Sequence, residues 1–495
     1  MLRRGPAVVA LLATLLAIGA WLPFLRAIVF PDEAGYLIIA EQWGPGQSLY
    51  GDYWVDRPPL IIWMYTLVAP FATVGHAPDG ATVPAIKLFG AAIAAVSVIL
   101  AFVLARRVAP DSPWSHWAAP VLTLVLVSSP LLGMPSTNGE LLALPFVLAG
   151  VALLAPALVQ PTGRRAPLAA FAAGMCAMAA VMVKQNFVDV YVFALVAFIV
   201  LSIRREQWLR VFSWFVAGSL VALVAIIGSA VLRGSSLADL WEAVVTFRFH
   251  ASALIGSDIS ETRAERIRIL VAAFVVSGAA ASLAITVPMV LGAEGRRRPR
   301  TGILAAPAVA MAAWEIAGVA LGGSYWLHYL TGVVPGVVLL MILAGSLERW
   351  RRLLTVGVVL GTVANTAVWA YRVYDPPQGR EDARVAAYLR EHARPNDSLV
   401  VGFGHSNVYV DAEMRGPYPY MWSLPARVND PKLRHAKEVL SGSEAPRWFV
   451  VHEGTPVFWS KAGRETRRHV EANYAEHGAI GDWHVWERRP TSRAP

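Results

Sequence analysis

The sequence predicts a polytopic α-helical membrane protein that carries a small soluble α/β domain at its C-terminus. Of its 495 residues, 56% are hydrophobic and only 16% are charged, and the mean hydropathy is +0.50. Water-soluble globular proteins carry about 25% charged residues. Long apolar runs recur up to residue 371, and the composition turns polar after residue 374. These observations exclude a disordered chain, a fibrous repeat and a cytosolic enzyme.

Candidate membrane spans follow one another through this apolar part. A bilayer core needs about 20 apolar residues per helix, and about 11 runs are candidates. The first run could instead be a signal peptide, because Arg3 and Arg4 precede it and Ala17–Ala20 resembles a cleavage site. It continues through Leu25, however, and is long enough to span. The runs lie near residues 7–28, 84–105, 115–133, 140–158, 167–183, 187–203, 211–232, 268–291, 302–321, 329–346 and 353–371.

Arginine clusters on alternate loops predict the orientation, because short cytoplasmic loops carry an excess of basic residues. A cytoplasmic N-terminus places every cluster on the cytoplasmic side, and an odd number of spans then places the tail outside. The clusters are Arg3-Arg4, Arg106-Arg107, Arg164-Arg165, Arg204-Arg205 with Arg210, Arg296-Arg297-Arg298 with Arg300, and Arg349 with Arg351-Arg352. The outer segments become residues 29–83, 134–139, 184–186, 233–267, 322–328 and everything after about 372.

A change of composition at Asp375-Pro376-Pro377 divides the chain into a membrane domain, residues 1–374, and a soluble extracytoplasmic domain, residues 375–495. Helical and strand patterns alternate in the second domain, which favours a small α/β domain with a mostly parallel sheet. Helices are predicted at residues 381–391, 430–440 and 462–476, and strands at 398–403, 447–452 and 480–487.

Charge and cysteine content exclude further classes of site. The net charge of +9 comes from arginines clustered between spans, not from a basic face interleaved with aromatic residues, so nucleic acid is not an expected partner. Cys176 is the only cysteine, which excludes disulfides and cysteine metal sites. His76, His328 or the outer acids could bind a divalent metal ion, although no spacing resembles a ligand motif. Metal binding is left open, and no cofactor is required.

The first outer loop, residues 29–83, contains an unusual set of polar residues. Asp32 and Glu33 are adjacent acids at the outer end of the first span, and charges near a membrane usually lie at its interface or face a cavity. Further along, Tyr50-Gly51-Asp52 and Asp56-Arg57-Pro58-Pro59 precede the apolar helix 60–71, which is too short to span and is expected in the interface. Solvated acids at a helix end or in a loop are the simpler alternative. Together the features favour a site at the membrane surface.

These motifs resemble the bacterial membrane glycosyltransferases of the GT-C fold, family 39, with its protein-mannosyltransferase and aminoarabinose-transferase relatives. The resemblance covers about residues 1–350 and, more loosely, the tail. One departure is that the residue before Pro-Pro is commonly lysine in this family, whereas here it is Arg57. The matching motifs are Asp32-Glu33, the Tyr50-Gly51-Asp52 and Arg57-Pro58-Pro59 pair, Asn138-Gly139-Glu140, Lys184-Gln185, and Tyr325-Trp326-Leu327-His328-Tyr329 with Pro335.

The resemblance implies a transferase that moves a sugar from a polyprenyl-phosphate carrier to an acceptor hydroxyl, usually with inversion. The acceptor would be an envelope glycan, a lipid or a protein, at the outer face of a bacterial cytoplasmic membrane. Asp32 matches the family's catalytic base, and Glu33 matches the position that holds the acceptor or orients the base. Donor phosphate binding is expected of Arg57, Lys184, Tyr325 and His328, and acceptor or sugar binding of Asp52, Asp56, Glu140 and Gln185.

Several of these residues have a plainer interpretation. Lys184 could snorkel from a helix end to the interface, and Tyr325 and His328 could belong to an interfacial aromatic belt. Glu140 could be an acid favoured at a helix start. For the whole chain, the alternative function is a transporter or lipid flippase, because polytopic proteins with intramembrane charges often move substrates. A catalytically inactive binding member of the fold is the third possibility.

Overall fold

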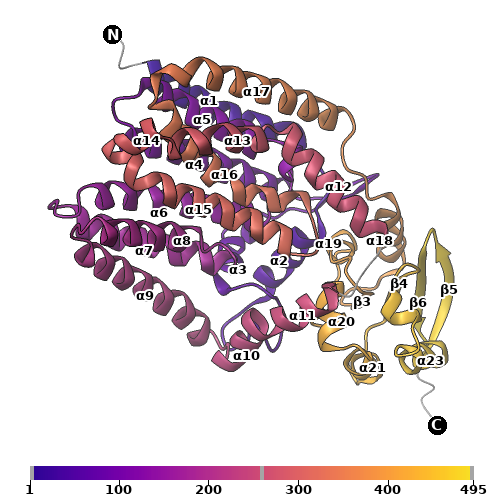
Figure 1. Cartoon of the computed structure of the whole chain (residues 1–495). Helices are drawn as coiled ribbons and strands as arrows, with labels where there is room; N and C mark the ends of the chain where they lie inside the picture. The colour runs from indigo at the N-terminus through magenta and orange to yellow at the C-terminus, as the bar shows by residue number, and fades with distance from the viewer. Residues whose placement is uncertain (1–4, 257–260, 491–495) are drawn as a thin grey trace.

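Long helices lie side by side and carry a small sheet region at one end (Figure 1). The computed structural model describes residues 5–256 and 261–490. The apolar helices are α1 (Gly5–Trp21), α4 (Pro84–Val108), α5 (Pro113–Val127), α6 (Gly139–Val159), α7 (Ala166–Val183), α8 (Asp189–Ile203), α9 (Leu209–Leu232), α12 (Glu261–Val276), α13 (Ala279–Leu291), α15 (Pro299–Leu321), α16 (Val334–Gly345) and α17 (Arg351–Tyr374).

Every predicted apolar run is helical, but the count of about 11 spans is not confirmed. Among the described residues, 8 helices are long and apolar enough to cross a membrane, or up to 9 if one bent pair counts as a single span. That pair is α12 and α13, which meet at 58°. The remaining runs, α5 and α8, have 15 residues each and are too short to satisfy the same criterion.

The bend between α12 and α13 has a local cause. Gly278 adopts a φ of +82°, which L residues other than glycine rarely adopt, and so interrupts the helix. The break leaves the carbonyl oxygen of Ser277 without an intrahelical partner, and Asn365 of α17 donates a hydrogen bond to it at 3.0 Å. A polar side chain thereby satisfies backbone that would otherwise lie unpaired inside the membrane.

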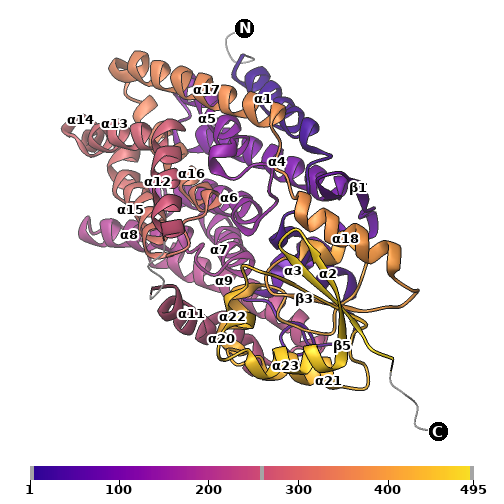
Figure 2. The ribbon, with the colours of Figure 1, turned by 90° about the vertical axis from the view of Figure 1, so that its right-hand side faces the viewer.

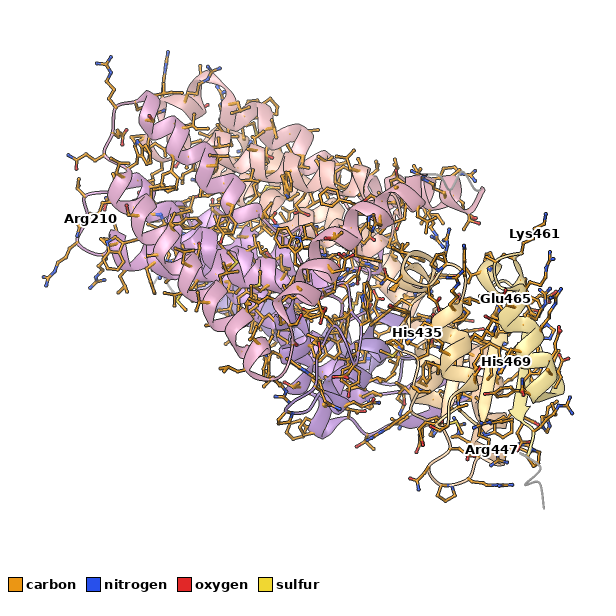
Figure 3. All side chains as sticks on the ribbon, turned by 90° about the horizontal axis from the view of Figure 1, so that it is seen from below. Arg210, His435, Arg447, Lys461, Glu465 and His469 are labelled. Atoms are coloured by element: carbon orange, nitrogen blue, oxygen red, sulfur yellow. The ribbon has the colours of Figure 1, made fainter. Side chains whose placement is uncertain are left out.

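The arginine clusters and the predicted site residues lie at opposite ends of the helices. The chain passes back and forth, so Arg106 and Arg107 stand in the last turn of α4 and Arg351 begins α17. Glu140 stands in the first turn of α6, and Lys184 follows α7. Figure 3 shows Arg210 at one end of the molecule and the C-terminal region at the other. The Arg3-Arg4 cluster lies outside the described residues.

The first outer loop folds into several short elements. The Asp32-Glu33 pair begins a separate helix, α2 (Pro31–Gln42), and does not end the first span, because that helix stops at Trp21 and Pro31 starts a new one. The helix predicted at residues 60–71 is divided into α3 (Pro59–Thr66) and a 3-10 turn at Ala69–Phe71, and β1 (Gly75–Ala77) pairs with β2 (Gly80–Thr82) as an antiparallel hairpin. Other short helices outside the apolar set are α10 (Leu237–Trp241), α11 (Phe247–Gly256) and α14 (Ala293–Arg297).

The C-terminal region contains one sheet, with the strand order β3-β4-β6-β5. The prediction of a mostly parallel sheet is wrong: only β3 and β4 are parallel, while β4–β6 and β5–β6 are antiparallel. The last helix ends at Asn473, and the next residues form β5, which turns through Gly481 at a φ of +60° into β6 as a hairpin. The elements are α18 (Arg380–His392), β3 (Leu399–Gly402), α19 (Asn407–Asp411), α20 (Ser423–Asn429), α21 (Arg434–Ser441), β4 (Trp448–His452), α22 (Pro456–Trp459), α23 (Arg464–Asn473), β5 (Tyr474–Ile480) and β6 (Trp483–Arg488).

The C-terminal region packs directly on α2 (Figure 2). The Ser406 hydroxyl donates a hydrogen bond to the carbonyl oxygen of Pro31, and the Trp422 ring lies over Gly35. A Cβ atom at Gly35 would stand 2.2 Å from Trp422 Cζ2, so only glycine permits this contact. Trp422 also packs on Tyr36, with 5.7 Å between the ring centroids. The helix that carries the acidic pair is therefore held between the membrane helices and the C-terminal region.

Candidate active site

Asp32 occupies the first turn of α2, where the helix N-terminus favours a negative charge. Its side chain is half-buried, and within the described residues no hydrogen-bond donor or cation contacts its carboxylate. It nevertheless lies within electrostatic range of Arg57, Lys184 and His328. A carboxylate without a structural partner, close to several basic groups, is available to accept a proton from a ligand.

Glu33, the other member of the pair, is fully buried and engaged on all sides. Lys87 Nζ donates to its two oxygens at 2.6 and 2.8 Å, and the backbone N–H groups of Thr137 and Phe30 donate at 2.6 and 3.0 Å. Lys87 is also fully buried and donates to the Pro135 carbonyl at 3.1 Å. The pair ties α2 to α4 and to the segment before α6, so Glu33 fixes the first turn of α2.

Arg57 belongs to an ion-pair cluster formed by two distant segments of the chain. Its Nη1 lies 2.6 Å from Asp56 Oδ2, and Arg248 Nη2 of α11 lies 2.5 Å from the same oxygen. Gln185 donates to the Asp56 carbonyl at 2.9 Å. Burial lowers the pKa of Arg57, but Asp56 and its other acidic neighbours raise it more, so the guanidinium stays charged. The Nε atoms of Arg57 and Arg248 are buried and have no partner among the described residues, which leaves donors for an anion.

A second charged cluster joins α6, α7 and the start of the Leu327–Gly345 span. Lys184 Nζ donates to Glu140 Oε1, and His328 Nε2 lies 3.8 Å from that oxygen. Lys184 Nζ also lies 4.8 Å from the centre of the Tyr329 ring. The side chain of Lys184 is 9% exposed, so it is not an extended interfacial anchor as the snorkelling interpretation would require.

Four residues that received no role in the sequence analysis lie at the site: Lys87 pairs with Glu33, Arg248 with Asp56, the Tyr329 ring lies beside Lys184, and Tyr36 is within electrostatic range of Arg57. The signal for Lys87 was available, because a charge inside an apolar span needs a buried partner. Tyr36 follows Asp32 by one helical turn, and burial raises its pKa well above the ordinary value, so its hydroxyl remains a donor. Tyr329 is part of the motif at residues 325–329, in which only Tyr325 and His328 were expected to bind the donor. Nothing local distinguishes Arg248 from the other arginines of the 233–267 segment.

Two predicted site residues lie apart from both clusters. Asp52 is exposed and accepts the Ser48 backbone N–H at 2.6 Å, which closes a local turn. Tyr325 has a φ of +53°, and its hydroxyl donates to the Ala320 carbonyl at 3.1 Å, at the end of α15. Both hydrogen bonds are local and stabilise the loop in which each residue lies.

A buried carboxyl pair lies near the second cluster. Asp189 begins α8 and Glu315 stands in α15; both side chains are buried and lie within electrostatic range of each other. Two neighbouring buried carboxyl groups cannot both stay ionised, so one of them is expected to carry a proton. Glu315 is within electrostatic range of Lys184 and Glu140. The pair links α8 and α15 and borders the cluster that holds Lys184.

The possible metal ligands are distributed differently from the expectation. His76 Nε2 lies 3.4 Å from Glu413 Oε1 and joins the β1–β2 hairpin to the C-terminal region. Within the described residues, one group of three possible ligands lies within 4.8 Å: Glu381, His452 and Asp482. His452 Nδ1 accepts the Gly454 N–H at 3.1 Å, which puts the proton of a neutral ring on Nε2. That tautomer favours hydrogen bonds over metal ligation.

The fold has solved counterparts among membrane proteins. ArnT from Cupriavidus metallidurans in the apo state superposes with a TM-score of 0.61 at 14% identity, over 98% of each chain, and ArnT bound to undecaprenyl phosphate gives 0.58 at 14% over 99% of this chain and 98% of the other. An Archaeoglobus fulgidus oligosaccharyltransferase tethered with an acceptor peptide gives 0.50 at 12%, over 98% of this chain and 74% of the other. No family model and no curated protein sequence matches the chain.

Proposed function

Starting from the GT-C fold that the chain shares with these membrane proteins, we propose that it is a membrane glycosyltransferase. It moves a sugar from a polyprenyl-phosphate donor to an acceptor hydroxyl of an envelope glycan, a lipid or a protein. The observation that carries the proposal is the unpartnered Asp32 carboxylate within electrostatic range of Arg57 and Lys184. ArnT, which has the same fold, is bound to undecaprenyl phosphate in one of its structures.

In the proposed reaction, Asp32 removes the proton from the acceptor hydroxyl as that oxygen attacks the anomeric carbon of the sugar. The bond from that carbon to the phosphate oxygen breaks, and the lipid phosphate leaves with the bonding electrons. Because attack comes from the side opposite the leaving group, the configuration is inverted. In this reaction, Asp32 therefore acts on the face of the sugar that the acceptor attacks, and the lipid phosphate leaves from the opposite face.

Negative charge grows on the phosphate as the sugar departs, and fixed cations stabilise it. We assign Arg57, Arg248 and Lys184 to the phosphate, with His328 and Tyr329 beside them. In the structure Asp56 and Glu140 neutralise these cations. A bound phosphate would compete with these carboxylates, which we assign, with Gln185, to positioning the cations and the sugar. Glu33 is assigned to positioning Asp32.

Donor binding can be tested at Arg57 and Lys184. Arg57→Gln and Lys184→Met are each expected to lower kcat/KM for the donor. The loss should correspond to roughly 1.5–3 kcal/mol of transition-state stabilisation, the range for hydrogen bonds to charged groups. Steady-state kinetics with a polyprenyl-phosphate sugar measure this, and the acceptor KM should change little. Arg57→Lys is the matched control, because it keeps the charge and should retain most activity. Unchanged donor kinetics in Lys184→Met would remove that residue from the phosphate site.

The orientation of the multi-pass chain is part of the proposal: the N-terminus is cytoplasmic, and the candidate site and C-terminal domain face outward in a bacterial membrane. The support is that the arginine clusters and the candidate residues lie at opposite ends of the helices. Reporter fusions after Arg165 and after Tyr374 are expected to report the cytoplasm and the outside, respectively. Two cytoplasmic signals would place every proposed catalytic residue on the wrong side.

A purified-protein assay distinguishes transfer from transport. In detergent there are no compartments, so a transporter or flippase has no net reaction to perform, whereas a transferase releases lipid phosphate from the donor. Asp32-dependent release of lipid phosphate supports the enzyme. Failure to release it with any polyprenyl-phosphate sugar, while the protein moves the same lipid across a vesicle bilayer, would favour the flippase.

A further inference from the structure

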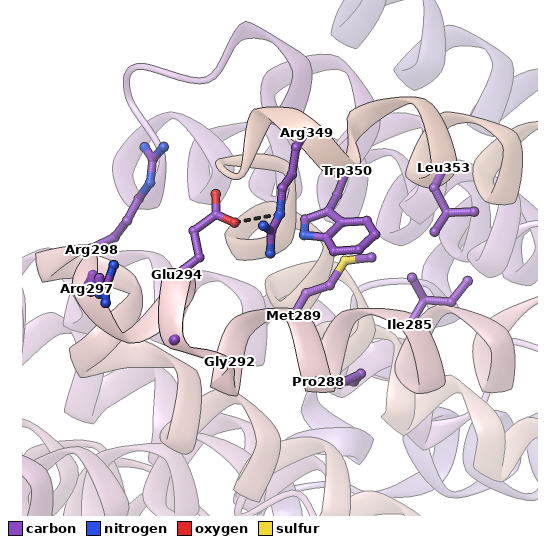
Figure 4. Close-up of a pocket in the computed structure, with 11 residues that line it drawn as sticks. Ile285, Pro288, Met289, Gly292, Glu294, Arg297, Arg298, Arg349, Trp350 and Leu353 are labelled. Carbon is purple, nitrogen blue, oxygen red and sulfur yellow. Dashed lines mark ion pairs between the residues drawn. The ribbon is translucent and has the colours of Figure 1, made fainter.

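A second possible ligand site lies at the arginine-rich end of the helices, far from Asp32. A cavity of about 750 Å³ separates α13 and α14 from the start of α17 (Figure 4). This volume is in the range of about 300–1,000 Å³ that is typical of small-molecule sites. None of the residues that line it has a role in the proposed reaction. The cavity therefore needs an explanation of its own.

The cavity has a charged end and an apolar end. Arg297, Arg298, Glu294 and Arg349 stand together at one end in Figure 4, whereas Met289, Ile285 and Leu353 extend away from them. Three arginines against one glutamate leave this end with a net charge of +2. This gradient matches an amphipathic molecule that has an anionic head.

The charged end also offers donors that are not firmly committed. Arg349 Nε pairs with Glu294 Oε2 at 2.7 Å, but the Arg349 side chain is 64% exposed, and exposed ion pairs are weak. The Trp350 indole N–H is buried and has no hydrogen-bond acceptor among the described residues. Figure 4 places that nitrogen on the side of Glu294 and Arg349. A phosphate at this end would accept from the indole and from the arginines.

The surroundings of the apolar end indicate what the tail of such a molecule meets. In the most apolar stretch of the last span, Glu348–Tyr374, only 17% of the residues are buried, and the exposed side chains just beyond the cavity include Val356 at 54% and Leu360 at 63% exposure. Such a face fits the hydrocarbon of a bilayer. Basic pockets between membrane helices at an interface bind anionic lipid head groups.

We propose that this cavity binds an anionic phospholipid of the membrane leaflet at the arginine-rich face. The lipid phosphate lies among Arg297, Arg298 and Arg349, and its acyl chains lie along Ile285, Met289 and Leu353. This site is distinct from the proposed donor site, which lies at the opposite helix ends.

Native mass spectrometry of the detergent-purified full chain tests the proposal. Wild-type protein is expected to retain one phosphatidylglycerol or cardiolipin in preference to phosphatidylcholine. The triple variant Arg297→Gln/Arg298→Gln/Arg349→Gln is expected to weaken this retention about tenfold or more, given the contribution of each basic residue near a lipid surface. The matched control Arg164→Gln/Arg165→Gln/Arg210→Gln removes three exposed arginines from the same face outside the cavity and should retain the lipid.

A second variant changes retention in the opposite direction. Glu294→Gln removes the one acidic group of the cavity and frees Arg349, so it is expected to increase retention of the anionic lipid, a gain that misfolding cannot produce. Glycerol phosphate, the head without acyl chains, should not displace the lipid at equal concentration. Equal retention of phosphatidylcholine, an equal loss in the control triple variant, reduced retention in Glu294→Gln, or displacement by glycerol phosphate would each overturn the proposal.

Discussion

Replacing Asp32 with asparagine is expected to leave the chain folded and to slow sugar transfer by about 10²- to 10⁴-fold, the usual contribution of a general base. The amide keeps the shape of the side chain but cannot accept the proton of the acceptor hydroxyl. Because no described residue pairs with the Asp32 carboxylate, its removal leaves no buried partner unsatisfied. The measurement is kcat for transfer from a polyprenyl-phosphate sugar, with thermal unfolding of the same preparation.

Asp52→Asn is the matched control for this variant. It makes the same chemical change in the same loop, at an exposed acid that closes a local turn, and should retain most of the wild-type kcat. If Asp32→Asn retained most of the turnover in properly folded protein, another group would have to be the base. Equal losses in both variants would indicate a general effect of charge in the loop.

The second large effect is expected for Lys87→Met, which removes the cation from a fully buried ion pair. Glu33 would remain as an uncompensated carboxylate, and breaking a buried pair in this way costs roughly 3–5 kcal/mol. We expect a lower yield of inserted protein and a lower midpoint of thermal unfolding in detergent. The decrease in unfolding midpoint should exceed that caused by Lys432→Met, which removes a lysine of the C-terminal region that is distant in sequence from Glu33 and Lys87.

A double variant separates the charge from the packing. In Glu33→Gln/Lys87→Met no buried charge is left alone, so stability should recover relative to Lys87→Met. Glu33→Gln alone leaves Lys87 unpaired and should lower stability and kcat, with little effect on acceptor KM, because Glu33 is fully buried. A selective rise in acceptor KM would instead support contact between Glu33 and the acceptor. An unfolding midpoint equal to wild type in Lys87→Met would show that the pair does not stabilise the fold.

The elements that the sequence predicted correctly are those governed by local composition. Each apolar run is helical in the structure, since a membrane span requires its own continuous apolar segment. The strands at residues 399–402 and 448–452 were recognisable in the same way. The relative directions of the strands could not be recognised from the sequence. An alternation of strands and helices does not distinguish a crossover from a hairpin, and β5 with β6 forms a hairpin.

For the candidate site, the sequence by itself indicated which polar residues gather at one end of the helices, because helices that pass back and forth carry their loops to alternate sides. The sequence could not show which of these side chains pair with one another. Only the tertiary structure pairs Glu33 with Lys87, 54 positions away, brings Arg248 to Asp56 across 192, and leaves the neighbouring Asp32 without a partner. Adjacent residues on a helix point in different directions, so two acids that are equivalent in the sequence differ in burial, and burial and pairing depend on segments that meet only when the whole chain has folded.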